Sequence, residues 1–165
     1  MAQRDDSLVY VLKVALRGNK RIWRRIALRG SQTLDDLHEM IYNAFDRGDE
    51  HLYSFYFPRP GSRGRAIVAD ARQYAHPVVC REEGIFKNFK LQNAANARLD
   101  SLSLRVGQSF LYLFDFGDEW WHVVTVEATN APLDGEQYPR IIERRGESPP
   151  QYPDDEEHWD GDDDE

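Results

Sequence analysis

The sequence has a single cysteine, Cys80, among its 165 residues. One thiol excludes an intramolecular disulfide framework and a zinc site built from several cysteines, and it suits a reducing compartment. No apolar run approaches the roughly 20 residues that are needed to span a bilayer. The charged N-terminus, MAQRDDS, lacks the apolar core of a secretory signal. We therefore expect a soluble, cytoplasmic protein that does not enter membranes.

Glycine-rich phosphate loops are also missing, because the sequence contains neither a Walker lysine motif nor G-x-G-x-x-G. Composition excludes disorder over most of the chain, since 41% of the residues are hydrophobic and 12% are aromatic. A chain of 165 residues is long enough for one compact domain and a tail. We predict a single domain over residues 1–153.

Acidic residues are concentrated at the C-terminus, where residues 154–165 hold nine acids and no Lys or Arg. Without these nine, 20 acidic residues face 21 basic ones, so the net charge of the remainder is +1, against −8 for the whole chain. Blocks of like charge repel one another and seldom pack. We predict a disordered acidic tail over 154–165. It either solubilises the protein or competes for a basic surface on this protein or on a partner.

Two runs rich in β-branched and aromatic residues, 8–16 and 21–28, flank Arg17-Gly18-Asn19-Lys20. Gly-Asn readily adopts positive φ, so this pattern predicts a β-hairpin. Both faces of the first run are largely apolar. That pattern is typical of a central strand covered on both faces.

The strongest helix signal spans residues 33–46. Thr33 and Asp36 have the spacing of a capping box, and Gly48 marks the end of the helix. Apolar residues recur at helical spacing, which puts them on one face of the helix: Leu34, Leu37, Ile41, Ala44 and Phe45.

The segment after this helix starts with a clear strand and then loses its pattern. A third strand is predicted over 51–57, because the Pro58-Arg59-Pro60-Gly61 run that follows cannot continue a ladder. From 58 to 104, the stretches that match helical or strand periodicity are short. They predict a strand at 67–68, a helix at 70–75 and a helix at 91–99.

A second hairpin is predicted where runs 108–115 and 120–127 flank Phe116-Gly117-Asp118-Glu119. A last short strand is expected at 138–144. These elements predict an α+β fold in one domain. Its mixed or antiparallel sheet contains two hairpins and additional strands, packed on the amphipathic helix 33–46.

Carboxylates and imidazoles are the candidate metal ligands. Asp115 and Asp118 flank the second hairpin turn, and His122 follows on the next strand. With help from His38 and His51, these side chains could converge on a divalent cation. The structural alternative stays open, because tight turns use Asp and Gly, and His122 could be a hydrogen-bonded core residue. The pattern indicates no particular cofactor.

Positive charge is concentrated in the first hairpin, where residues 17–29 hold six basic side chains and no acid. A tryptophan among arginines can stack on a base while guanidinium groups contact phosphates. The alternative is a solvated face whose tryptophan packs beneath arginine side chains. The candidate nucleic-acid contacts are Lys20, Arg21, Trp23, Arg25 and Arg29.

Aromatic residues are too numerous for one face of one sheet, so most of them are expected in the core. A few could line a groove for a peptide or a small ligand. The candidates are Tyr53, Trp120 and Trp121. Cys80 follows Val78-Val79 and is expected to be a small buried residue.

Four blocks occur in order along the chain: Ile22-Trp23-Arg24-Arg25-Ile26, Thr33-Leu34-Asp35-Asp36-Leu37-His38, His51-Leu52-Tyr53-Ser54-Phe55 and FDFGDEWWH at 114–122. This series resembles the plasmid pRiA4b ORF-3-like family over residues 8–153. The resemblance implies a single α+β domain from bacteria or archaea, often encoded near plasmids or other mobile elements. It implies no settled activity.

Two properties of that family are not carried over. Some members are labelled resolvases, but no serine of this chain lies among convergent arginines as recombinase chemistry requires. Many members also have cysteines and a Pro-Pro-Glu-Asp run near the C-terminus. This chain has GESPPQYP at 146–153 instead, so any metal role of that region does not transfer.

We therefore expect a non-catalytic binding or accessory protein, associated with mobile elements, that contacts a protein or nucleic-acid partner. The first alternative is a metal-dependent hydrolase or nuclease, in which Asp115 and Asp118 hold the metal and His122 or another histidine acts as general base. The second is a nucleic-acid-binding protein in which the acidic tail screens residues 20–29. The sequence does not indicate the oligomeric state.

Overall fold

The structure is a computed structural model of the chain, and it describes residues 8–82, 91–132 and 134–152. The predicted acidic tail, 154–165, lies outside the described residues, so its disorder and its role stay predictions. No helix within the three described stretches is long and apolar enough to cross a bilayer.

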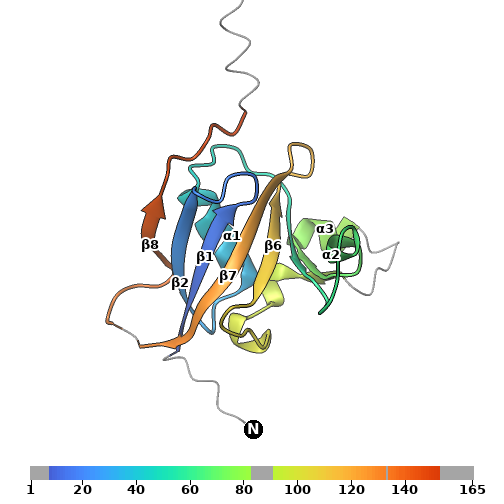
Figure 1. The fold of residues 1–165 in the computed structure, drawn as a ribbon. Helices are drawn as coiled ribbons and strands as arrows, with labels where there is room; N and C mark the ends of the chain where they lie inside the picture. Colours follow the sequence, from blue (N-terminus) through green and yellow to red (C-terminus); the bar gives the residue numbers. More distant parts are fainter. Residues whose placement is uncertain (1–7, 83–90, 133, 153–165) are drawn as a thin grey trace, which may run out of the picture.

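Eight strands form one sheet in the order β5-β4-β3-β6-β7-β1-β2-β8 (Figure 1). Neighbouring strands are antiparallel except β4 and β5, which are parallel, so the sheet is mixed. The α+β class is as predicted. The strands are β1 Val9–Leu16, β2 Trp23–Arg29, β3 Tyr53–Phe57, β4 Arg72–Ala75, β5 Leu91–Asn93, β6 Ser109–Phe114, β7 Trp120–Ala131 and β8 Arg140–Arg145.

The two predicted hairpins form the middle of the sheet. β1 pairs with β2 and β6 pairs with β7, both antiparallel. β1 also pairs with β7, which joins the two hairpins and makes β1 an interior strand, as predicted. Its outer face is only partly covered, because Val11 and Lys13 keep part of their surface exposed. The prediction that both faces of this strand are covered was therefore wrong at these two residues.

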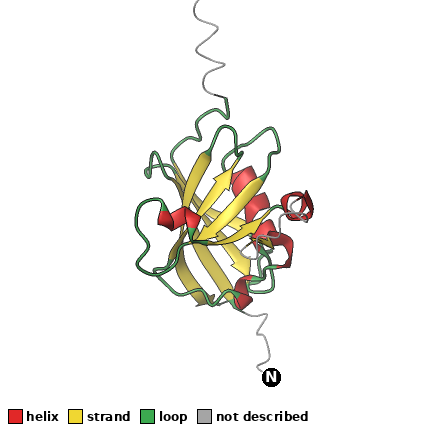
Figure 2. Ribbon diagram, turned by 90° about the vertical axis from the view of Figure 1, so that its right-hand side faces the viewer, coloured by secondary structure: helices red, strands yellow, loops and turns green. Residues whose placement is uncertain are grey.

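The predicted helix is α1, Leu34–Ala44, and it lies along the inner face of the sheet (Figures 1 and 2). Thr33 accepts a hydrogen bond from the Asp36 amide, and the Asp36 carboxylate accepts one from the Thr33 amide. This capping box satisfies two amides at the helix start. The apolar face joins one core cluster with residues of β1 and β2, including Leu12 and Ile26.

The segment 58–104 differs from the sequence predictions. Residues 66–69 form a short helix, α2 Ala66–Ala69, where a strand was expected. Residues 72–75 form β4 where a helix was expected, because they pair with β3 in the register Phe55↔Tyr74. Residues 91–93 form β5, followed by the 3-10 turns η2 Ala94–Asn96 and η3 Leu99–Ser101, in place of one helix. A further helix, α3 Pro77–Glu82, lies with α2 at the side of the sheet opposite β8 (Figure 1).

Most aromatic side chains of the described residues are in the core or pack against it, as predicted. The inner faces of β3 and β6 bury five of them at no more than 1% exposure: Tyr53, Phe55, Phe110, Tyr112 and Phe114. Phe116, at the tip of the second hairpin, is an exception at 41% exposure. Cys80 is half-buried and its sulfur lies 3.8 Å from the Ala75 carbonyl oxygen, so the prediction of a small buried residue was wrong.

Candidate functional site

The turn between β6 and β7 is closed by hydrogen bonds of its own aspartate. The Asp115 carboxylate accepts from the amides of Gly117 and Asp118 at 3.0 and 3.3 Å. Asp115 and Glu119 both have positive φ, at 66° and 54°. Aspartate tolerates this conformation when its side chain bonds the following amides. Asp115 therefore has a structural role in the turn.

His51 is the one candidate metal ligand that lies beside Asp115. Its Nε2 atom is 3.5 Å from the Asp115 carboxylate and 2.9 Å from the Tyr152 hydroxyl. Asp118 is exposed at the tip of the turn and points its charge to solvent. The structure thus brings two of the five predicted ligands together.

His38 lies on α1 beneath the sheet and is 4% exposed. Its ring stacks on Tyr53 with centroids 3.8 Å apart, and its Nδ1 is 2.6 Å from the Tyr112 hydroxyl. Burial, with a smaller contribution from the charge of His76, lowers the pKa of His38 to about 3. The imidazole is therefore neutral at physiological pH.

His122 lies on the core-facing side of β7 and is completely buried. It packs edge-on against Phe45, and neither ring nitrogen has a hydrogen-bond partner among the described residues. Burial, followed by the charge of Arg47, lowers the pKa of His122 to about 3. Strand alternation explains this position, because His122 pairs with Tyr112 on the inner face while the turn carboxylates lie at the sheet end.

The five predicted ligands therefore do not converge. Over the part of the chain that the structure describes, no three His, Cys, Asp or Glu side chains are arranged to hold a metal ion. A shallow cleft of about 350 Å³ brings His38 and His51 to the same surface as His76, Glu39 and Glu50. Sequence reasoning did not single out His76, which reaches this cleft from the end of β4.

The basic hairpin is partly neutralised in the folded protein. Arg25 forms ion pairs with Glu127 on β7 and Glu143 on β8. Trp23 lies between the Lys13 and Arg25 side chains, with ring-to-cation distances of 4.7 and 4.9 Å. Arg29 lies over the ring of Tyr138. Only Lys20 and Arg21 of the five predicted nucleic-acid contacts are exposed.

Arg24 has a structural role. Sequence analysis counted it only as one of the six basic residues of the first hairpin. It is 2% exposed and donates to the carbonyl oxygens of Ala44 and Arg145 and to the Ser148 hydroxyl. The alternation of side chains along the strand did indicate this position, because it places Arg24 on the same face as Ile26 and Leu28. A charge at such a position predicts a buried group with fixed partners.

Arg47 is a second buried cation, 7% exposed. Its guanidinium lies 4.2 Å from the Trp120 ring centroid, and its Nη1 and Nη2 atoms have no hydrogen-bond partner within the described ranges. Burial lowers the pKa of Arg47 to about 10. Nothing in the local sequence distinguishes it from an exposed arginine after a helix.

A groove of about 560 Å³ opens between the two hairpin turns, and we call it the tryptophan groove. Trp120 and Trp121, two of the three candidates for a ligand groove, line it. Tyr53 does not, because it is buried in the core and donates its hydroxyl to Asp35. The other lining residues come from the first hairpin, the second turn and the C-terminal segment: Leu16, Arg17, Gly18, Asn19, Ile22, Glu119 and Pro149.

The two tryptophans are held differently. The Trp120 indole is covered by Arg47 and donates from Nε1 to the Gln151 carbonyl at 3.3 Å. The Trp121 ring lies near Tyr56, at 5.5 Å between centroids, and near the Arg17 guanidinium, at 5.6 Å. Trp121 Nε1 makes no hydrogen bond to any residue that the structure describes.

The segment 146–152 forms one wall of this groove through Pro149. The Gln151 side chain accepts from the amides of Gly48 and Asp49, and Tyr152 donates to the Asp49 carboxylate. These contacts join the end of the described chain to the loop after α1. Sequence analysis assigned no contacts to this segment.

The family model described as plasmid pRiA4b ORF-3-like protein matches residues 8–157. The chain is 27% identical over 130 residues to uncharacterized protein y4hQ of Sinorhizobium fredii (strain NBRC 101917 / NGR234). That match covers 79% of this chain and 58% of y4hQ, so the chain spans little more than half of this relative.

The fold is similar to the crystal structure of a protein of unknown function, MM3350, from Methanosarcina mazei Go1. The TM-score is 0.67 at 24% identity, over 95% of this chain and 84% of that one. The names of both relatives state no activity. The family model, in contrast, matches nearly the whole described chain. The chain belongs to the plasmid pRiA4b ORF-3-like protein family.

Proposed function

We propose that this protein is a non-catalytic accessory domain that binds an acidic segment of a protein partner in the tryptophan groove. One observation carries the proposal: the Trp121 indole lies in an open groove beside the Arg17 guanidinium. An aromatic ring next to an exposed cation is a typical anchor for a peptide that combines an apolar side chain with carboxylates.

The floor of the groove supplies the apolar part of this recognition. Leu16, Ile22, Trp120, Trp121 and Pro149 present aliphatic and aromatic surface in one concave area. Trp121 is half-buried, so burial of its remaining surface by a partner is favourable. Its indole N–H is available to a carbonyl of the bound segment.

The rim supplies the charge. Arg17, Lys20 and Arg21 are exposed on the first hairpin turn, and none of them has an ion pair with a described residue. Glu119 is the one carboxylate in the groove lining. Arg17 and Glu119 balance each other in the lining, so the net positive charge comes from Lys20 and Arg21 on the adjacent turn. This charge favours an acidic occupant, and it steers association at low ionic strength.

The groove is held in place by hydrogen bonds between the segments that form it. Leu16 donates its amide to the Ile22 carbonyl at 3.0 Å, and Arg17 donates to the Trp121 carbonyl at 2.9 Å. The Trp120 indole bonds Gln151 in the opposite wall. A groove that is already ordered loses little conformational entropy when a partner binds.

Binding is favoured over hydrolysis at the second turn because the predicted catalytic groups lie on different surfaces. Asp115 bonds its own turn, Asp118 is exposed at the tip and His122 is in the core. General acid–base catalysis needs these groups within hydrogen-bond reach of one substrate.

The cellular setting is also part of the proposal. The family description names a plasmid open reading frame, which supports a partner encoded by a mobile element. The single cysteine supports a reducing compartment such as the cytoplasm.

The test uses fluorescently labelled decapeptides that carry a central Leu or Phe flanked by Asp and Glu. A matched set has Lys at every acidic position. Fluorescence anisotropy with the full chain should detect saturable binding of the acidic set only. Trp121→Ala should weaken this binding about tenfold or more, as expected for an interface aromatic anchor, and Arg17→Gln should weaken it less.

Trp23→Ala is the matched control, because Trp23 also lies between cations but outside the groove. Its affinity for the acidic peptides should equal that of the unmodified chain. Equal binding of both peptide sets, or full affinity in Trp121→Ala, would show that the groove does not recognise acidic segments.

A further inference from the structure

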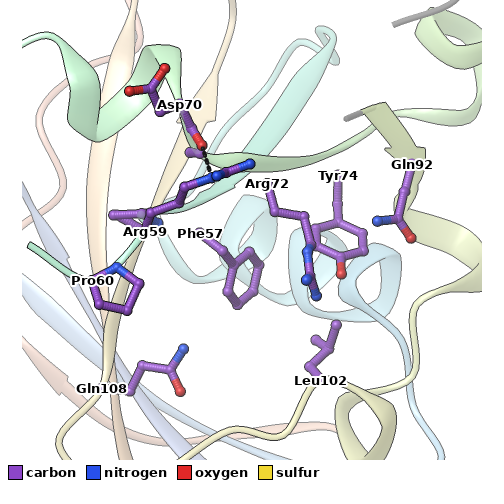
Figure 3. A pocket seen from close by; sticks show the side chains of 11 residues that line it. Phe57, Arg59, Pro60, Asp70, Arg72, Tyr74, Gln92, Leu102 and Gln108 are labelled. Carbon is purple, nitrogen blue, oxygen red and sulfur yellow. Dashed lines mark hydrogen bonds between the residues drawn. The ribbon is translucent and has the colours of Figure 1, made fainter. Parts of the chain in front are cut away.

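A further cavity, of about 360 Å³, lies at the other end of β6 from the tryptophan groove. Gln108, which lines it, immediately precedes β6, whereas Trp120 pairs with Phe114 at the far end of that strand. We call this cavity the arginine pocket. Its charged, aromatic and amide side chains include Phe57, Arg59, Arg72, Tyr74, Gln92 and Gln108 (Figure 3).

Two guanidinium groups reach the pocket without a carboxylate partner. Arg59 and Arg72 are both exposed, and neither forms an ion pair with a residue in the described ranges. Arg59 Nε donates to the backbone carbonyl of Asp70 at 3.1 Å, which orients the guanidinium at the rim. The Asp70 carboxylate itself points away from the pocket (Figure 3). With two arginines and one aspartate, the lining therefore has a net positive charge.

Arg72 is placed by the sheet. It is the first residue of β4 and pairs with Phe57, the last residue of β3, so both side chains lie on the same face. Its side chain lies beside those of Phe57 and Tyr74, which also line the pocket (Figure 3). A cation on a strand is more rigidly positioned than one on a loop tip.

Aromatic surface lies beside these cations. The Phe57 ring stacks on Phe110 with centroids 4.3 Å apart and meets Tyr74 edge-on at 5.3 Å. These contacts fix the orientation of Phe57, which stays half-exposed. A planar ligand ring can pack against its free surface.

Two amide side chains complete the lining. Gln108 accepts from the Arg105 amide at 3.1 Å through Oε1, which leaves its Nε2 as a donor. In the described part of the chain, the Gln92 amide makes no hydrogen bond, so it offers both a donor and an acceptor. Such groups can bond the edge of a heteroaromatic ring.

We propose that the arginine pocket binds a nucleoside monophosphate. Arg59 and Arg72 contact the phosphate, because guanidinium groups match phosphate oxygens in pairs. The base packs on Phe57, and Gln92 and Gln108 bond its edge. The volume is that of a pocket for one small molecule and is too small for a polynucleotide. Arginines here take the role that glycine-rich backbone loops have in other phosphate sites.

The experiment is isothermal titration of the full chain with AMP, GMP, CMP and UMP, and with inorganic phosphate. At least one nucleotide should bind saturably and more tightly than phosphate, and added salt should weaken it. Arg72→Gln should reduce the affinity about tenfold or more, since it removes a charged phosphate contact. Phe57→Leu should reduce the difference in affinity between the nucleotide and inorganic phosphate.

Arg63→Gln is the matched control, because Arg63 is exposed on the same loop but does not line the pocket. Thermal melting of each variant verifies that it is folded before its affinity is compared. The proposal is overturned if no nucleotide binds at millimolar concentration, or if Arg72→Gln and Arg63→Gln behave alike. Equal affinity for phosphate and every nucleotide would overturn the assignment of the base to Phe57. The groove proposal is unaffected by these outcomes, because the two sites share no residue.

Discussion

Arg24 of β2 donates from Nε to the main-chain oxygen of Ala44, the last residue of α1, at 2.8 Å. Further hydrogen bonds from the same guanidinium reach Arg145 at the end of β8 and Ser148 beyond it. One buried cation thus connects the sheet, the helix and the segment that forms a wall of the tryptophan groove. Hydrogen bonds that involve a charged group are stronger than neutral ones, and their loss inside a protein is costly.

Arg24→Met should therefore lower the free energy of unfolding by about 3 kcal/mol, the range for loss of several buried charge-assisted hydrogen bonds. Arg21→Met is the control, because Arg21 is exposed on the adjacent turn, and it should change stability by less than about 0.5 kcal/mol. Urea unfolding of both variants measures the difference. Similar midpoints for the two would contradict the role assigned to Arg24.

The free energy of unfolding should decrease as the pH is lowered, because His122 is neutral in the folded chain. Its pKa is lowered from 6.5 to about 3, so below pH 6.5 the unfolded state binds a proton that the folded state does not. Each pH unit below that value costs about 1.4 kcal/mol for this one residue. His122→Leu should remove this part of the slope. Urea unfolding at pH 7.5, 6 and 5 measures it, and an unchanged slope in the variant would refute the prediction.

Gly146 should be intolerant of a side chain. It has φ of 77°, and a Cβ atom there would lie 3.0 Å from Ile22 Cγ1 and 3.2 Å from Ile22 Cα. Gly135 has a similar φ of 81°, but a Cβ atom at that position would have open space around it. Gly135→Ala should cost about 1 kcal/mol from backbone strain alone, and Gly146→Ala should cost clearly more. Equal melting temperatures of Gly135→Ala and Gly146→Ala would contradict a steric clash at Gly146.

The acidic tail leads to a prediction about competition between its carboxylates and nucleic acid for the basic hairpin. If residues 154–165 screen the basic hairpin, a chain ending at Pro153 should bind single-stranded DNA more tightly at low salt. The physical reason is the removal of nine carboxylates, which changes the net charge from −8 to +1. Fluorescence anisotropy at 20 mM and 200 mM salt, about a threefold change in Debye length, would reveal the effect. The same affinity with and without the tail would reject screening.

Local patterns were sufficient for the elements whose stability comes from near neighbours. The alternation of the two hairpins and the Thr33–Asp36 capping box act within a few residues. The reason given for the first turn was wrong, because neither Gly18 nor Asn19 has the expected positive φ. The interior position of β1 also followed from its apolar pattern, since a strand paired on both sides needs such residues. The family resemblance was visible in the same segments, and the family model confirmed it.

Other features depended on contacts between distant residues. β4 was expected to be a helix, but pairing with β3 made it a strand, because ladder hydrogen bonds override weak helical propensity in a four-residue segment. Asp118 and His122 are only four residues apart, yet His122 entered the core while Asp118 stayed in solvent. Asp118 lies in the turn at the end of the sheet, whereas His122 lies within β7 on the face that packs on the core.

The sequence alone determined the fold class, both hairpins and the main helix, because turn chemistry and side-chain periodicity are local properties. Tertiary structure alone decided the two candidate binding sites. The tryptophan groove joins residues 16–19, 22, 119–121 and 149, and the arginine pocket joins residues 57–60, 70–72, 74, 92, 102 and 108. Sheet order brings these segments together, and sheet order depends on which strands can bury their inner faces in one common core.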